Sequence, residues 1–171
     1  MSEEKKEVLL SDLGEDGEVT LFEGQPFTGV CVDYYDNGKK RYKEHYKGGQ
    51  PHGLSTGWYK NGKKNKESSF KDGELDGLWT EWYANGKKKS KVHMKDGKPH
   101  SLWTEWYANG KKKAETNYKN GELHGLWTTW NKNGKKEREM NCDGELPGIW
   151  TKLSEIGKKI SEKHYKDGNE Q

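Results

Sequence analysis

Tryptophan and lysine recur along the chain at a spacing of about 24 residues, and both residue types support noncovalent recognition. Large aromatic side chains are favoured anchors of protein interfaces. Clustered lysines attract acidic proteins, phospholipid head groups or nucleic acid. We therefore expect a partner-binding surface, and its candidate residues are Trp58, Trp79, Trp82, Trp103, Trp106, Trp127, Trp130, Trp150, Lys87, Lys88, Lys89, Lys111, Lys112 and Lys113.

Both sets of residues also have a structural interpretation. Residues three apart in a regular strand point to opposite faces, so Trp79 and Trp82 would lie on different faces unless a bulge brings both inward. The rings would then either hold the sheet together or line a groove for a partner. The lysines that follow each Asn-Gly pair would either attract an anionic partner or keep the sheet soluble and unpaired.

Catalytic and metal chemistry have little support in the sequence. His52, His100 and His124 share one repeat position, but equivalent residues of adjacent repeats should be ~10 Å apart, whereas Zn–N distances are ~2 Å. No GxSxG, P-loop or HExxH motif occurs. Recurring carboxylates such as Glu81 and Glu105 fit solvated strand positions. We expect no enzyme activity, no metal and no cofactor.

Each repeat contains the elements that would position these side chains. Residues 78–83, Leu-Trp-Thr-Glu-Trp-Tyr, suit a half-buried strand. Asn85-Gly86 then predicts a tight hairpin turn, because both residues tolerate positive φ. A second strand over about 88–94 ends at Asp96-Gly97, another turn signal. A two-residue type I′ loop and a three-residue loop with a bulge both fit the Asn-Gly step, so the strand register stays open.

The Asn-Gly pairs define the repeat. They occur at Asn37-Gly38, Asn61-Gly62, Asn85-Gly86, Asn109-Gly110 and Asn133-Gly134, and a degenerate sixth copy is Ile156-Gly157. Six tandem hairpins predict an all-β fold, an elongated antiparallel meander in the form of a ribbon or trough. We expect an N-terminal segment over 1–22, the repeat array over 23–168 and a tail over 169–171.

Composition limits what can hold this array together. The 171 residues are 28% apolar and 35% charged, with a mean hydropathy of −1.35, but 12% are aromatic and the formal net charge is only +3. Disorder favours few aromatics and high net charge, so order should come from aromatic rings. Cys31 and Cys142 fit free thiols in a reducing compartment. Without a signal-peptide pattern or a ~20-residue apolar stretch, the expected location is cytoplasmic.

The pattern HGLWTxWYxNGKK followed by YKDG resembles the MORN-repeat variant (membrane occupation and recognition nexus), and Pro26 to Val30 matches the Pro-Phe-Thr-Gly-Val opening of bacterial members. The resemblance covers about 23–168 and implies a β-hairpin array used as a scaffold or binding surface; some bacterial members are antitoxin or immunity-type proteins. The chain departs from the pattern at Ser101, at Leu54-Ser55, at Leu153 and by one residue missing between Gly134 and Gly144.

These observations favour a non-enzymatic module that binds a protein partner, and the resemblance extends this to a toxin as partner. The alternative is an electrostatic adaptor that binds anionic membrane lipid or nucleic acid through the lysine edge. A third role is a homodimer, because open sheet edges can pair with a second copy.

Overall fold

The computed structural model describes residues 7–143, 145–154, 157–166 and 169–170, and it divides into two compact units, Met1–Gly86 and Lys87–Gln171. Among the described residues the regular structure is strand, apart from one short 3₁₀ helix, η1 (Leu10–Asp12). No helix in the described ranges is long and apolar enough to cross a membrane.

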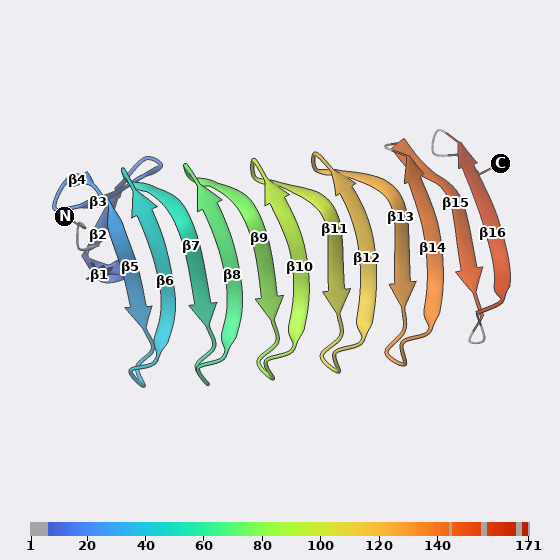
Figure 1. Cartoon of the computed structure of the whole chain (residues 1–171), viewed down its shortest axis with the longest axis horizontal. Helices are drawn as coiled ribbons and strands as arrows, with labels where there is room; N and C mark the ends of the chain where they lie inside the picture. Colours follow the sequence, from blue (N-terminus) through green and yellow to red (C-terminus); the bar gives the residue numbers. More distant parts are fainter. Residues whose placement is uncertain (1–6, 144, 155–156, 167–168, 171) are drawn as a thin grey trace. The chain divides into compact units, whose positions relative to one another are not determined.

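The first unit is a meander with a small N-terminal sheet. Its strands are β1 (Glu7–Leu9), β2 (Leu13–Asp16), β3 (Val19–Phe22), β4 (Gln25–Pro26), β5 (Gly29–Tyr34), β6 (Lys40–Lys47), β7 (Gln50–Trp58), β8 (Lys64–Lys71) and β9 (Glu74–Trp82). Strands β5 to β9 pair in sequence order and antiparallel, β1 joins β5 in parallel, and β2, β3 and β4 form a separate sheet at the β5 end (Figure 1).

The second unit continues the same pattern. Its strands are β10 (Lys88–Lys95), β11 (Lys98–Trp106), β12 (Lys112–Lys119), β13 (Glu122–Trp130), β14 (Lys136–Asp143), β15 (Glu145–Leu153), β16 (Lys159–Lys166) and β17 (Asn169–Glu170). Each pairs antiparallel with the next. The predicted all-β antiparallel meander of tandem hairpins is thus confirmed within each unit.

The Asn-Gly step adopts the longer of the two predicted loops. Gly62 donates its backbone N–H to the Tyr59 carbonyl over 2.7 Å, and Tyr59 donates to the Lys63 carbonyl over 2.8 Å. Gly62 has φ of 88°, whereas Asn61 is not among the residues with positive φ. This is a three-residue hairpin loop with glycine in the left-handed position.

The opposite end of the strands carries the two-residue turn. Lys71 and Glu74 are Cα partners, and the two residues between them, Asp72 and Gly73, have φ of 49° and 88°. Positive φ at both central residues is the requirement of a type I′ turn, whose twist matches that of the strands. In this repeat, Asp72-Gly73 and not Asn61-Gly62 therefore provides the tightest reversal.

A bulge follows each of these tight turns. Ser68 pairs with Trp79 and Phe70 with Leu75, so two extra residues are accommodated on β9. Gly77 takes up the extra length with φ of 108°. The equivalent residue on β11 is Ser101, which holds φ of 77° despite its Cβ.

The core of the first unit lies at its N-terminal end. Val8, Phe27 and Cys31 form a buried cluster, against which Phe22 and Tyr46 pack. Further along both units the most buried side chains include hydroxyls at one repeat position: Thr56 and Thr80 in the first unit, Thr104 and Thr128 in the second. Cores built from small polar residues and half-buried rings agree with the low apolar fraction of the sequence.

Candidate functional site

Cross-strand pairing assigns the side chains of the first unit to two faces. We call the face carrying the paired row Glu44, Ser55, Ser68 and Trp79 the Glu44 face. We call the other the Thr80 face, because its neighbouring row is Thr56, Glu67 and Thr80. Since side chains alternate along a strand, Leu78 and Trp82 lie on the Thr80 face.

The first tryptophan series packs into the sheet. Trp79, Trp103 and Trp127 are each half-buried. The Trp103 indole N–H donates to the Ser90 hydroxyl over 2.7 Å, and its ring lies 5.8 Å from that of Tyr118, centroid to centroid. Lys66 Nζ lies 5.9 Å from the centre of the Trp79 ring. The side chain of Trp150, the last member of this series, lies outside the described residues.

The second tryptophan series is also half-buried: its members are Trp58, Trp82, Trp106 and Trp130. Lys64 Nζ lies 5.7 Å from the centre of the Trp82 ring, and Lys112 Nζ lies 5.6 Å from that of Trp130. Cation–π contacts of this kind are worth about 0.5–1 kcal/mol at exposed sites. These rings therefore have structural partners within the sheet.

Many of the candidate lysines are engaged as well. Lys87 and Lys111 each donate to the Asn carbonyl of the next Asn-Gly turn, Asn109 over 2.6 Å and Asn133 over 2.7 Å. Lys112 pairs with Glu115 over 2.6 Å, and Lys113 with Glu105 over 3.4 Å. All six candidate lysines, Lys88 and Lys89 included, are exposed.

Exposed leucines recur at one repeat position, which the sequence analysis missed. Leu54 and Leu78 in the first unit are 44% and 42% exposed, and Leu102 and Leu126 in the second are 42% and 47% exposed. All four occupy one repeat position, two residues before the buried threonines, and so lie on the Thr80 face or its equivalent. The signal was present in the sequence, because a two-residue period through Leu78, Thr80 and Trp82 places them on one face.

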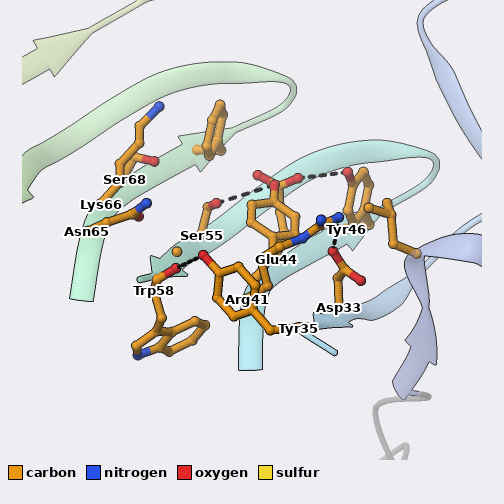
Figure 2. Close-up of a pocket in the computed structure, with 14 residues that line it drawn as sticks. Asp33, Tyr35, Arg41, Glu44, Tyr46, Ser55, Trp58, Asn65, Lys66 and Ser68 are labelled. Atoms are coloured by element: carbon orange, nitrogen blue, oxygen red, sulfur yellow. Dashed lines mark hydrogen bonds and ion pairs between the residues drawn. The ribbon is translucent and has the colours of Figure 1, made fainter. Parts of the chain in front are cut away.

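A cavity of about 620 Å³ opens on the Glu44 face of the first unit (Figure 2). It lies where the repeat pattern is interrupted: Ser55 stands at the position of Trp79, and Gly57 at that of Glu81. The lining residues are Leu10, Asp33, Tyr35, Arg41, Tyr42, Glu44, Tyr46, Ser55, Gly57, Trp58, Asn65, Lys66, Ser68 and Phe70. The small side chains at the interruption leave this space unfilled.

A buried carboxylate is the main polar group of the cavity. Glu44 is only 5% exposed, and the Tyr46 hydroxyl donates to its Oε2 over 2.7 Å, as Figure 2 shows. The Ser55 hydroxyl donates to that of Tyr42 over 3.4 Å. Burial, and then hydrogen bonding to Glu44, raise the pKa of both tyrosine hydroxyls. The two phenols therefore stay protonated at neutral pH and serve as donors beside the carboxylate.

The other charges of the cavity are engaged with different groups. Arg41 forms an ion pair with Asp33. Lys66 reaches the Trp79 ring, as described above. Within the described part of the chain, no set of three His, Cys, Asp or Glu side chains is placed to hold a metal ion. His52, one of the shared-position histidines, instead contacts Asp72 through Nδ1 over 3.2 Å.

Comparison with protein families agrees with the repeat geometry. The sequence model of the MORN repeat variant matches residues 27–47, 51–72, 75–96, 99–120 and 123–141. The chain belongs to the MORN repeat variant family. MORN repeats are generally associated with modules that bind proteins or membranes. The cavity lies between the first and second matched MORN repeats. A comparison with curated proteins found no match.

Proposed function

We propose that this MORN-repeat protein is a non-enzymatic module that binds a protein partner through the exposed leucines. The observation that carries the proposal is the shared repeat position of Leu54 and Leu78 in the first unit and of Leu102 and Leu126 in the second. In a chain that is only 28% apolar, leucines left open to water at a repeated position favour a surface that a partner covers.

The surroundings of the leucines suit a protein partner with apolar side chains. On the same face lie half-buried tryptophans and buried threonine hydroxyls. The charge between Thr56 and Thr80 is that of Glu67, which is paired with Lys64. A mostly apolar centre within a polar rim is the usual anatomy of a protein interface.

Anionic membrane lipid or nucleic acid is the less favoured partner. Lysines at two successive positions after the Asn-Gly step are engaged, for example Lys63 with the Asn85 carbonyl and Lys136 with Glu139. A lysine bonded to a carbonyl keeps its charge but has fewer free donors for a phosphate, and one paired with a carboxylate has its charge offset. Binding to anionic vesicles or to nucleic acid that falls steeply between low and physiological salt would favour the electrostatic adaptor instead.

The main experiment is affinity capture from the native host with Leu102→Gln/Leu126→Gln. Both leucines are more than 40% exposed, so the fold should persist and far-UV circular dichroism should be unchanged. We expect wild type to recover a stoichiometric protein and the double variant to lose it. Lys60→Gln/Lys132→Gln, which changes two exposed residues away from the leucines, is the control and should retain the partner. Equal capture by wild type and the leucine variant would refute the proposal.

A toxin is the narrower partner that the family resemblance favours. Co-expression with the product of the neighbouring gene should restore growth if that product is toxic, and the leucine variant should fail to restore it. Light scattering over a concentration series tests the homodimer: a mass that rises with concentration in wild type but not in the leucine variant would make a second copy the partner.

A further inference from the structure

The cavity lies at a position that a tryptophan ring fills in the other described repeats. The positions equivalent to Ser55 are Trp79, Trp103 and Trp127, all half-buried rings on their strands. The equivalent of Tyr42 two repeats later is Ser90, which accepts the Trp103 indole N–H. At the cavity the large and small residues are exchanged, and the exchange leaves about 620 Å³ open.

Glu44 lines the cavity with a buried carboxylate. The equivalent residues in the next repeats are Ser68, Val92 and Thr116, so the carboxylate is specific to the cavity. It is 5% exposed, and no described basic side chain lies within ion-pair distance of it. Burying a carboxylate without a cation in contact is costly. Arg41 is paired with Asp33 and Lys66 lies at the Trp79 ring, so the Glu44 carboxylate itself has no direct counterion.

Aromatic rings surround the carboxylate. Tyr42 and Tyr46 flank Glu44 on β6, at alternate positions that share its face, and Phe70 lines the cavity from β8. Ring faces attract cations, and the attraction grows when the cation is desolvated. We propose that the cavity binds an organic cation, an ammonium or guanidinium group, which is paired with Glu44 and enclosed by these rings.

The volume sets the size of this ligand. Small-molecule sites are typically ~300–1,000 Å³, so the cavity holds an alkyl chain together with its charged end. The same cationic group can come from a free amine or from a lysine or arginine side chain of a bound protein. The site lies on the face opposite to the leucines, so it does not depend on the proposed function.

The binding experiment uses matched small probes and the whole chain. Butylammonium, butylguanidinium and choline are titrated against ¹⁵N-labelled protein, with butanol and butyrate as neutral and anionic controls of similar size. We expect saturable shifts at the backbone amides of Ser55, Gly57 and Ser68 with the cations alone. Equal shifts with butanol would show an apolar pocket and overturn the cation proposal, and so would the absence of saturable shifts with every cation.

Three variants test the assigned groups. Glu44→Gln removes the charge at constant shape and should weaken cation binding at least tenfold. Tyr42→Ser/Ser55→Trp recreates the arrangement of Ser90 and Trp103, and should fill the cavity and abolish binding. Glu115→Gln, which makes the same charge change outside the cavity, should bind like wild type. Wild-type affinity in Glu44→Gln would overturn the assignment even if the double variant fails to fold.

Peptides separate the two sources of the cation. Gly-Ser-Lys-Ser and Gly-Ser-Arg-Ser are compared with a norleucine peptide of the same length. Tighter binding of the basic peptides than of the free amines would identify a protein side chain as the ligand. The reverse order would identify a free amine.

Discussion

Trp103 donates its indole N–H to the Ser90 hydroxyl over 2.7 Å, and the equivalent pair two repeats earlier, Ser55 and Tyr42, has the large and small residues exchanged, with 3.4 Å between their hydroxyls. A large residue faces a small one in both pairs. The two pairs are thus complementary in size across neighbouring strands, and the cavity lies where the order of large and small residues is reversed.

The first prediction tests this complementarity. Tyr42→Ser should lower the free energy of unfolding by about 2 kcal/mol through the lost ring, and Ser55→Trp by about 1–3 kcal/mol through overpacking against Tyr42. The double variant should be more stable than the two losses added together, with a coupling of at least about 1 kcal/mol. Urea unfolding of the four proteins measures the coupling, and strict additivity would contradict it.

The second prediction concerns the bulge on β11. Ser101 holds φ of 77°, and a residue with a Cβ pays ~1–2 kcal/mol in the left-handed region. Ser101→Gly should therefore stabilise the protein by about 1 kcal/mol in urea unfolding.

Gly125 is the matched control for this bulge. It has φ of 75°, and no atom lies within 4 Å of a Cβ built there. Gly125→Ser should thus lower the free energy of unfolding, through the backbone alone, by about as much as Ser101→Gly raises it. A stability loss in Ser101→Gly would show that the Ser101 side chain contributes more than its backbone costs.

The third prediction concerns the lysines at the Asn-Gly turns. Lys111 donates to the Asn133 carbonyl, and its Cδ lies 3.3 Å from where a Gly134 Cβ would be. Lys111→Ala should lower stability by about 0.5–1 kcal/mol, the net worth of one exposed hydrogen bond. Lys132→Ala, at an exposed lysine of the turn that Lys111 contacts, should change it by less. Equal effects in thermal unfolding would mean that only the loss of charge matters.

The fourth prediction is alkaline destabilisation through Cys31. Burial, then the carboxylates of Glu44 and Asp33, raise the pKa of this thiol to about 11, against ~8.5 in an unfolded chain. Between these values the unfolded chain binds fewer protons than the folded one, so stability falls as pH rises through about 9 to 11.

The pH dependence separates the thiol from its neighbours. Cys31→Ala should flatten the decline between pH 9 and 10, where the tyrosines contribute least. Val32→Ala, at a residue only 2% exposed, should lower stability at every pH and keep the slope. An unchanged slope in Cys31→Ala would assign the decline to other groups.

The sequence was sufficient for the repeat and for the order of the strands, because Asn-Gly and Asp-Gly steps mark most reversals of the array. It was not sufficient for the type of each turn. Asn61-Gly62 fits both loop types, and the choice depends on pairing across the loop, here the bonds between Tyr59 and Lys63. Those bonds depend on the register of whole strands, which no local pattern encodes.

The candidate site was only partly predictable. Ser55 stood out in the sequence as an interruption, but the cavity depends on what faces it, Glu44 and Tyr42 on the neighbouring strand. The sequence correctly assigned each of the two tryptophan series to one repeat position. The half-burial of the rings depends on lysines and hydroxyls that contact them from other strands. The exposed leucines followed from strand alternation and could have been recognised beforehand.

The bonds between successive Asn-Gly turns give the array a direction. Lys63 reaches forward to Asn85, and Lys111 to Asn133, in the same sense in each unit. Among the described residues, an internal hairpin such as that of Asn61 and Lys63 thus offers a donor to its successor and an acceptor to its predecessor. A duplicated hairpin would bring one donor and one acceptor, so gene duplication can lengthen such a protein in the middle without leaving either group unmatched. A hairpin inserted in the opposite orientation would interrupt the series of contacts.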